Sequence, residues 1–581
     1  MIKKAWLLLS VLACSSTSSW KPGQPLTLDL SSVFPAGTAL RDQYSGAAAT
    51  VASSGSVTIT PDASGVVLFE RAGAAATSFS WANATVYFVM TDRFFNGDSS
   101  NDNSYGRVKD GAQEVGTWHG GDLKGLTAKL DYIASLGATA IWVSPLVEQV
   151  HGWVGGGTGD FKYYGYHGYW ALDFTRLDQN FGTSADLTAF VDGAHQRGIR
   201  VLLDVVMNHP GYATGDDLVS YLPEVFFDGT GAAFKSFTPH DNRGWLAWND
   251  LVDYKSPSWQ KWWSPSWIRA GLGPSGMFDP GGNDDLTRSL TFLPDFKTEN
   301  PAAAGVPFFF SRKSDTGFTS DLGFSVRQYL VAWHSDWVRQ YGFDGFRCDT
   351  AKNVELSSWQ ALKQAAVAAL HDWKTANPSK KLDDAPFWMT GEVYGHGVTK
   401  DSYFTDGGFD SLINFDFQGG IRDLLLAKPS LADSASTLET YYSNYAGMIS
   451  GDPSFDVLSY ISSHDTHLFA DVMKNDLGLL RQGGTALLLA PGGAQIFYGD
   501  ESGRLFGPTG SDPVQGTRSD MNWSSVDAAT LSHFSKLATF RKRHAAVGAG
   551  SHQKLNSPSG TYAFARKKDQ DAVVVVVTPV K

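Results

Sequence analysis

Eight strand-like runs that alternate with helical patterns constrain the fold of this chain more than any other feature. The runs are short and mostly apolar, at residues 86–90, 140–144, 200–206, 345–349, 387–393, 412–417, 457–464 and 494–498. Between most of them apolar residues recur at helical spacing, as at residues 123–136, 185–197, 325–341, 356–376 and 531–544. Eight alternating strands predict a closed parallel (β/α)8 barrel of the TIM type. An open doubly wound sheet is the alternative, but no glycine-rich phosphate loop follows the first strand.

Three segments lie outside this alternation. Residues 210–320, after the third strand, are rich in Gly, Pro, Trp and Asp, and a structureless loop of that length is uncommon, so we predict an inserted subdomain. The barrel then takes residues 80–209 and 321–547. Strand patterns at residues 23–72 and 548–581 predict an all-β sandwich built from both chain ends, because the C-terminal segment alone offers too few strands. A small separate N-terminal module is the alternative.

The N-terminus predicts export. Lys3 and Lys4 precede an apolar stretch that is too short to span a bilayer, so residues 1–14 indicate an export signal. Cys14 and the serines after it resemble the acceptor of a bacterial lipoprotein signal, although Leu12 is larger than the usual residue. We expect a periplasmic protein, or a membrane-anchored lipoprotein tethered only through a lipidated Cys14.

Charge and cysteine content narrow the function further. The 47 basic and 59 acidic residues give a net charge of −12, which argues against a broad basic surface for nucleic acid. A neutral substrate would not be repelled. The chain has two cysteines, Cys14 and Cys348. We expect Cys348 to be a buried barrel residue rather than a nucleophile, because no His or Asn pattern supports a thiolate.

Acidic residues stand at or near the ends of four strand-like runs. Asp204 lies in the third run, and Asp349, Glu392 and Asp465 lie at or directly after later ones. The carboxyl ends of barrel strands meet on one face, so we expect these side chains to converge there. Converging carboxylates are what cleavage of a glycosidic bond needs. One acid after a strand is often a helix cap, but four in this order, with Arg347 two residues before Asp349, predict a glycosidase site.

These residues and several longer runs resemble the α-amylase family of glycoside hydrolases. The runs lie at residues 92–94, 119–122, 166–169, 506–513 and 518–523, and the resemblance extends from about residue 86 to the C-terminus. It implies endo-hydrolysis of α-1,4-glucosidic bonds in starch and maltodextrins, with retention of configuration through a covalent glycosyl-enzyme. A transglycosylating or exo-acting relative that forms maltooligosaccharides carries the same acids and is the alternative. A non-catalytic glucan-binding protein is more remote, because all three acids are present.

The resemblance also implies roles for individual residues. Asp349 is implied as the nucleophile, Glu392 as the general acid/base and Asp465 as the transition-state stabiliser. We expect Arg347 to keep Asp349 ionised, and apolar surroundings to keep Glu392 protonated. Substrate contacts, with Tyr169 as the stacking platform, are implied for Tyr169, His167, Trp170, Asp204, His209, Arg347, Lys352 and His464.

Calcium is the cofactor that the resemblance implies. Asn208 and Asp295 match ligands between the barrel and the inserted subdomain, with the backbone carbonyl of Asn353 as a third. The family has His at this last position, so Asn353 puts the contacts with the leaving-group sugar in question. A second candidate site consists of Asn96, Asp98, Asn101, Asp102, Gly120 and Asp122. A solvated turn rich in Asn and Asp is the alternative there.

Overall fold

The computed structural model describes residues 20–108, 114–155, 162–237, 247–269, 281–427, 431–510 and 512–578. The chain divides into two compact units. One contains the residues up to Ala74, residues 428–443 and the residues from His552 onward, and the other contains residues 75–427 and 444–551. No helix among the described residues is long and apolar enough to cross a membrane. The predicted export signal and Cys14 lie outside the described residues, so both stay predictions.

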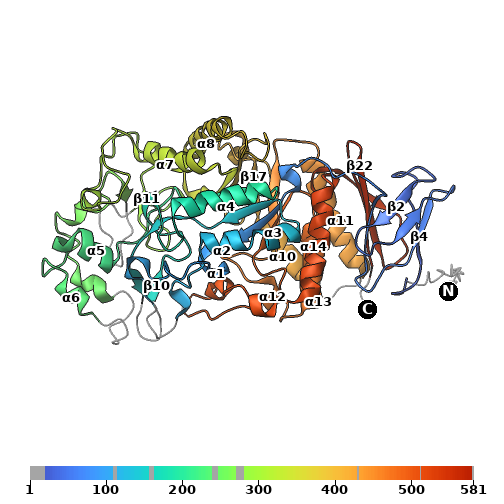
Figure 1. Cartoon of the computed structure of the whole chain (residues 1–581), viewed down its shortest axis with the longest axis horizontal. Coiled ribbons are helices and arrows are strands. Elements are labelled where there is room, and N and C mark those ends of the chain that lie inside the picture. The colour runs from blue at the N-terminus through green and yellow to red at the C-terminus, as the bar shows by residue number, and fades with distance from the viewer. Residues whose placement is uncertain are drawn as a thin grey trace, which may run out of the picture. The chain divides into compact units, whose positions relative to one another are not determined.

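A closed barrel of eight parallel strands forms the larger unit, as the alternating pattern predicts (Figure 1). In barrel order the strands are β12 (Arg200–Val205), β15 (Gly345–Cys348), β16 (Trp388–Gly391), β17 (Ser411–Asn414), β18 (Asp456–Tyr460), β19 (Gly493–Phe497), β6 (Thr85–Val89) and β7 (Ala140–Val143). Pairing of β7 with β12 closes the ring. All eight strands are buried along their whole length, which explains why they read as continuous apolar runs rather than as alternating ones.

Helices follow most of the barrel strands. The longer ones are α4 (Ser184–Gln196), α7 (Val326–Tyr341), α8 (Leu356–Ala376), α10 (Phe415–Leu426), α11 (Leu431–Ile449), α13 (Leu477–Leu488) and α14 (Ala528–Arg543). Capping boxes start two of them, from Thr183 for α4 and Ser325 for α7. The helix predicted over residues 123–136 is two helices, α2 (Leu123–Ala128) and α3 (Leu130–Leu136), because Lys129 leaves the helical region.

Residues 210–320, here called subdomain B, interrupt the barrel after β12. Their described parts include α5 (Gly215–Tyr221), α6 (Ala232–Lys235) and the antiparallel pair β13 (Ile268–Arg269) and β14 (Asp295–Phe296). The aromatic residues that enrich this segment form its interior, with Trp262 stacked on Phe309 at 4.4 Å between ring centroids. Fully buried tryptophans in the described part of this segment are Trp248, Trp259, Trp262, Trp263 and Trp267. Most of the tryptophan content is therefore core and not a binding surface.

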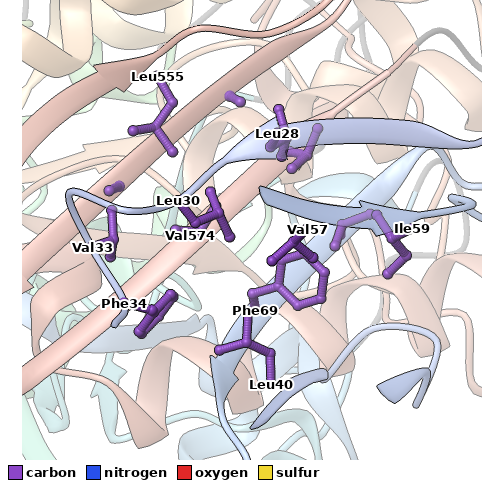
Figure 2. Packing of buried hydrophobic residues seen from close by; sticks show 14 of the residues in the cluster. Leu28, Leu30, Val33, Phe34, Leu40, Val57, Ile59, Phe69, Leu555 and Val574 are labelled. Atoms are coloured by element: carbon purple, nitrogen blue, oxygen red, sulfur yellow. The ribbon is translucent and has the colours of Figure 1, made fainter. Parts of the chain in front are cut away.

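Strands from the two chain ends share one sheet in the smaller unit. Its order is β20 (Ser551–Leu555), β21 (Tyr562–Lys568), β22 (Asp571–Val577), β5 (Val66–Arg71), β2 (Ala39–Asp42) and β3 (Ala48–Thr50). The join is the antiparallel pairing of β22 with β5, where Val574 lies opposite Phe69. A second, two-stranded sheet pairs β1 (Leu26–Asp29) with β4 (Ser56–Ile59). Figure 2 shows the apolar cluster shared by these strands, which includes Leu28, Phe69 and Val574.

Candidate active site

The barrel backbone places two acids at one edge. The amide of Asp349 donates to the carbonyl of Val205 at 2.9 Å, and the amide of Glu392 donates to the carbonyl of Cys348 at 2.9 Å. These bonds continue the ladders between β12, β15 and β16 by one residue beyond each strand. Asp349 and Glu392 therefore leave neighbouring strands at the carboxyl end of the barrel, where barrel enzymes carry their chemistry.

One guanidinium binds three carboxylates at this edge. Arg347 lies opposite Asp204 in the ladder, and its Nη1 donates to Asp204 Oδ1 at 3.1 Å and to Asp349 Oδ1 at 2.7 Å. Its Nη2 lies 2.9 Å from Glu392 Oε2. Arg347 is 1% exposed and Asp349 5% exposed, so this ion pair is buried. Because a guanidinium is small and rigid, the two acids that it bridges must lie close together.

Burial controls the protonation of this cluster. Burial raises the pKa of Asp349 above its ordinary value, although Arg347 lowers it in the expected direction, and the ionised state of Asp349 stays a prediction. Burial likewise raises the pKa of Glu392 to about 7 against the effect of Arg347, and the charges of Asp349 and Asp465 raise it further. Burial raises the pKa of Asp204 to about 7. Two of the acids around Arg347, Glu392 and Asp204, thus titrate near neutral pH.

Asp465 behaves in the opposite way. The strand predicted to reach residue 464 ends at Tyr460, so Asp465 lies on the following loop. Its carboxylate lies 3.0 Å from His464 Nε2 and 2.9 Å from Arg518 Nη2. Burial raises the pKa of Asp465, but His464 and Arg518 outweigh burial and hold that pKa well below its usual range. Asp465 therefore stays ionised beside the cluster.

Arg518 is a site residue that sequence reasoning missed. It ends a 3-10 turn, Gln515–Arg518, and besides Asp465 it donates to the carbonyl of His464 at 3.1 Å. The run at residues 518–523 was singled out for its resemblance, yet nothing in its spacing shows that its first residue reaches an acid far earlier in the chain. The presence of a cation in that motif was the signal that the sequence offered.

Aromatic and imidazole side chains surround the acids. The Tyr169 hydroxyl donates to Asp204 Oδ2 at 2.6 Å, and the Tyr169 ring stacks on His464 with centroids 5.3 Å apart. The amide of Tyr169 donates to His167 Nδ1 at 3.0 Å. His209 is 3% exposed, and its Nε2 has no hydrogen-bond partner among the described residues. Burial lowers the pKa of His209 to about 4, which leaves a neutral imidazole facing the interior.

The described contacts of Trp170 and Lys352 go to residues other than the acids Asp349, Glu392 and Asp465. The Trp170 ring meets Tyr212 edge-on at 4.9 Å, and its amide donates to Gln149. Lys352 follows the nucleophile candidate closely in sequence, but its ammonium pairs with Asp285 of subdomain B at 3.0 Å. Neither residue bonds directly to Asp349, Glu392 or Asp465 among the contacts of the described chain.

Oxygen atoms converge where the first calcium site is predicted. The Asn208 side-chain oxygen faces the carbonyl oxygen of Asn353 at 3.0 Å and a carboxylate oxygen of Asp295 at 3.2 Å. Hard cations bind such oxygen sets. A half-turn of the amide would let its nitrogen donate to both oxygens instead, so the residues fit calcium without requiring it. The other Asp295 oxygen accepts from Arg269 at 2.7 Å.

The second predicted calcium site is largely bonded within the protein. Asp98 pairs with Lys124, and Asp122 caps α2 by accepting from the amide of Gly125 at 2.6 Å. Asn96 donates to Asp102 at 2.8 Å, and Gly120 adopts a left-handed φ of 92° beside them. Asn101 Oδ1 is the one buried side-chain oxygen of this set that finds no donor among the described residues. In the described chain no group of three or more His, Cys, Asp or Glu side chains could hold a metal.

Cys348 does not take part in the site. Its side chain is fully buried in β15, and burial raises the pKa of the thiol well above its ordinary range. A thiol in this environment does not supply a thiolate near neutral pH. The expectation of a buried barrel residue is confirmed.

Known proteins share both the sequence and the fold. Residues 88–267 and 308–525 match the family described as alpha amylase, catalytic domain. The chain is 50% identical over 573 residues to a periplasmic alpha-amylase of Escherichia coli (strain K12), a match that covers 95% of this chain and 81% of that protein. An alpha-amylase of Streptomyces lividans is 28% identical over 80% of this chain and 51% of its own length. The solved structure of an Anoxybacillus alpha-amylase superposes with a TM-score of 0.56 at 23% identity, covering 86% of this chain and 87% of that one.

Proposed function

The chain belongs to the α-amylase family of glycoside hydrolases, and on that premise we propose that it is an exported enzyme that cleaves internal α-1,4-glucosidic bonds with retention of configuration. The family acts on α-1,4-glucans. The observation that carries the mechanism is the Arg347 cluster, in which one guanidinium bridges Asp349 and Glu392. Retaining glycosidases need two carboxyl groups about 5 Å apart, one ionised and one protonated.

In the proposed first step the Asp349 carboxylate attacks the anomeric carbon while Glu392 gives its proton to the departing glycosidic oxygen. The C–O bond to the leaving sugar breaks, and a glycosyl–Asp349 ester forms. The raised pKa of Glu392, about 7, supports its role as the proton donor. The 2.7 Å contact of Asp349 with Arg347 supports the ionised form of Asp349.

In the second step Glu392, now ionised, takes a proton from water, and the water oxygen replaces Asp349 on the anomeric carbon. Positive charge develops on the sugar in both transition states. Asp465, held ionised by His464 and Arg518, is suited to offset that charge. Tyr169 is proposed as the stacking platform, and the buried Nε2 of His209 as a hydrogen-bond partner for a sugar hydroxyl. His167, Trp170 and Asp204 complete the proposed substrate contacts.

Calcium is proposed as a structural cofactor held by Asn208, Asp295 and the Asn353 carbonyl, with the Asn96–Asp122 group as a weaker second site. The approach of the Asn208 side-chain amide to the Asn353 carbonyl at 3.0 Å and to an Asp295 carboxylate oxygen at 3.2 Å supports the first. When bound, calcium would supply positive charge that ties subdomain B to the barrel. Export to the periplasm is supported by the basic and apolar N-terminus and by the periplasmic relative. Lipidation of Cys14 is the finer proposal, and Cys14→Ser should then release the protein from membranes.

One incubation tests the proposed function. Maltoheptaose treated with the enzyme and followed by chromatography should give several shorter products from the earliest times. A single product size would indicate exo action, and products longer than maltoheptaose would indicate transfer. Proton NMR of the first product should show the α-anomer, and an initial β-anomer would overturn the retaining mechanism.

A further inference from the structure

The loop after Asp349 is held on one side by Glu392. The amide of Thr350 donates to Glu392 Oε2 at 3.0 Å, and the amide of Ala351 donates to the Glu392 carbonyl at 2.8 Å. Thr350 adopts a left-handed conformation, with φ 45° and ψ 41°, which is unfavourable for a β-branched residue. Such a conformation persists where the surroundings fix it. The course of residues 350–353 is therefore set by the acid/base residue on this side.

Asp285 of subdomain B holds the same loop on the other side. Its Oδ2 pairs with Lys352 Nζ at 3.0 Å, and its carbonyl accepts from Asn353 Nδ2 at 2.6 Å. Its other carboxylate oxygen pairs with Arg288 at 2.9 Å. One residue thus uses its carboxylate and its carbonyl to bind two consecutive residues of the catalytic loop.

Stability alone is a poor explanation for this arrangement. The side chains of Lys352 and Asp285 are 40% and 39% exposed, and ion pairs this exposed contribute little to folding. Asn353, in contrast, is 8% exposed, and its side-chain amide nitrogen donates to the Asp285 carbonyl. In the family a His occupies this position, so the departure noted in the sequence has a structural use here: Asn353 anchors Asp285.

We propose that Asp285 is a positioning residue for the leaving-group side of the site, which holds the Lys352 ammonium where a sugar hydroxyl can accept from it. This rests on the proposed function: the resemblance implies a substrate contact for Lys352, and the loop that carries Lys352 is bonded to Glu392, the proposed proton donor to the leaving sugar. An ammonium has three donors, and Asp285 occupies one, so the others are free for hydroxyls. A lysine fixed beforehand loses less conformational entropy when substrate binds.

Two substrates separate this role from a general one. Maltoheptaose has a sugar leaving group, whereas 2-chloro-4-nitrophenyl maltotrioside has an aryl leaving group with no hydroxyl for Lys352. Asp285→Asn removes the charge and keeps the carbonyl that Asn353 binds. We expect kcat/KM for maltoheptaose to fall about tenfold, mainly through KM, and that for the aryl glycoside to change less than about twofold.

The matched control is Asp192→Asn. Asp192 of α4 pairs at 2.7 Å with Lys380, which lies in the turn after α8, and this pair is also partly exposed and belongs to the same unit. Neither substrate should respond to that change. Equal losses on both substrates with Asp285→Asn, or no loss on maltoheptaose, would overturn the proposal. If wild-type enzyme released no product from either substrate, the proposed function itself would fail, which is a distinguishable result.

A double-mutant cycle supplies the second test. Lys352→Met should reproduce the loss on maltoheptaose, and Lys352→Met combined with Asp285→Asn should be no worse than Lys352→Met alone, because Asp285 acts through Lys352. Losses that multiply would show that the two residues act independently and would contradict the proposal. If Asp285→Asn were not recovered as folded protein, Lys352→Met and Lys352→Arg on the same two substrates would decide, with Arg expected to restore part of the loss.

Discussion

Two buried cations in the larger unit each hold three carboxylates, yet only one of these clusters has the form of an active site. Arg347 binds Asp204, Asp349 and Glu392, as described above. Lys313 is the other cation, and it is 3% exposed. Both clusters combine burial, excess negative charge and a raised carboxyl pKa, which are the signals commonly used to find functional sites.

The Lys313 cluster connects subdomain B with the loops after β7. Its ammonium lies 2.7 Å from Glu148 in β8 (Val147–Gln149), 3.4 Å from Asp173 in β11 (Ala171–Leu177) and 2.6 Å from Asp315. Glu148 and Asp173 are fully buried. Burial outweighs Lys313 and raises the pKa of Glu148 to about 8. His151 Nε2 also lies 2.8 Å from Glu148 Oε1.

Donor geometry accounts for the difference between the clusters. A guanidinium has a planar fork, so Arg347 places its acids on two nitrogens and leaves the Glu392 side chain 12% exposed. An ammonium is a point charge, and Lys313 gathers its acids around itself, with Glu148 and Asp173 fully enclosed and the Asp315 side chain 41% exposed. Charge and burial therefore identify both clusters. The clusters differ in the acid that solvent reaches: in the Arg347 cluster it is Glu392, whose pKa is raised, and in the Lys313 cluster it is Asp315, whose pKa Lys313 lowers against the effect of burial.

The largest expected effect separates the clusters by activity. Asp349→Asn should lower kcat on maltoheptaose by roughly 10⁴-fold or more, because the amide cannot form the glycosyl ester. Asp315→Asn removes a carboxylate from the Lys313 cluster and should leave kcat within about twofold. Steady-state kinetics on both variants checks this, and a near-wild-type rate for Asp349→Asn would refute the assignment of the nucleophile.

The next effect separates them by stability. Lys313→Met leaves buried carboxylates without their cation and should cost about 3–5 kcal/mol of unfolding free energy at pH 7. The loss should grow as the pH rises through about 8, because Glu148 then ionises without its cation. Urea denaturation at pH 7 and pH 9 measures both quantities. An equal loss at the two pH values would contradict an electrostatic origin.

The pH profile gives a smaller but specific effect. The general acid must carry a proton, so log kcat/KM should fall by one unit per pH unit above an apparent pKa of about 7. That value belongs to the Arg347 cluster as a whole. Folded Asp315→Asn should show the same decrease of log kcat/KM with pH as wild type. A shift of its apparent pKa in that variant would show that the two clusters are electrostatically coupled.

The smallest effect concerns Glu148. Burial raises its pKa from an ordinary 4.5 to about 8, so below pH 4.5 the folded and the unfolded wild type both carry the proton, and Glu148→Gln should change the free energy of unfolding by less than about 1 kcal/mol there. Above pH 4.5 the unfolded wild type releases this proton while the folded state keeps it up to about pH 8, so the wild type loses stability across this window. The variant should therefore gain on wild type between about pH 4.5 and pH 8 and no further above it, as measured by thermal unfolding. A variant that lost stability relative to wild type over this window would contradict the raised pKa of Glu148.

How much of the structure the sequence could predict depends on whether a pattern reports local burial or contacts between distant segments. Periodicity reports local burial, and it located all eight barrel strands and the acids Asp349 and Glu392 at their ends. It overextended β18, which ends at Tyr460: only Ile461 continues the apolar run, and Ser462, Ser463 and His464 lie on a loop. The contacts of Arg518 with Asp465 and of Asp285 with Lys352 join distant segments. Such pairs depend on how loops close, and no periodic pattern encodes that.

The pairing of β22 with β5 has a consequence for biosynthesis. The ribosome makes β5 before the barrel and β22 after it, so β5 lacks this neighbour while the barrel segment is being made. An apolar strand with an unpaired edge is prone to join other chains. The early strands consequently need shielding while the barrel is translated, and this sheet can be completed only after β22 has emerged from the ribosome. Removing the residues from Val574 onward would leave that edge of β5 permanently unpaired.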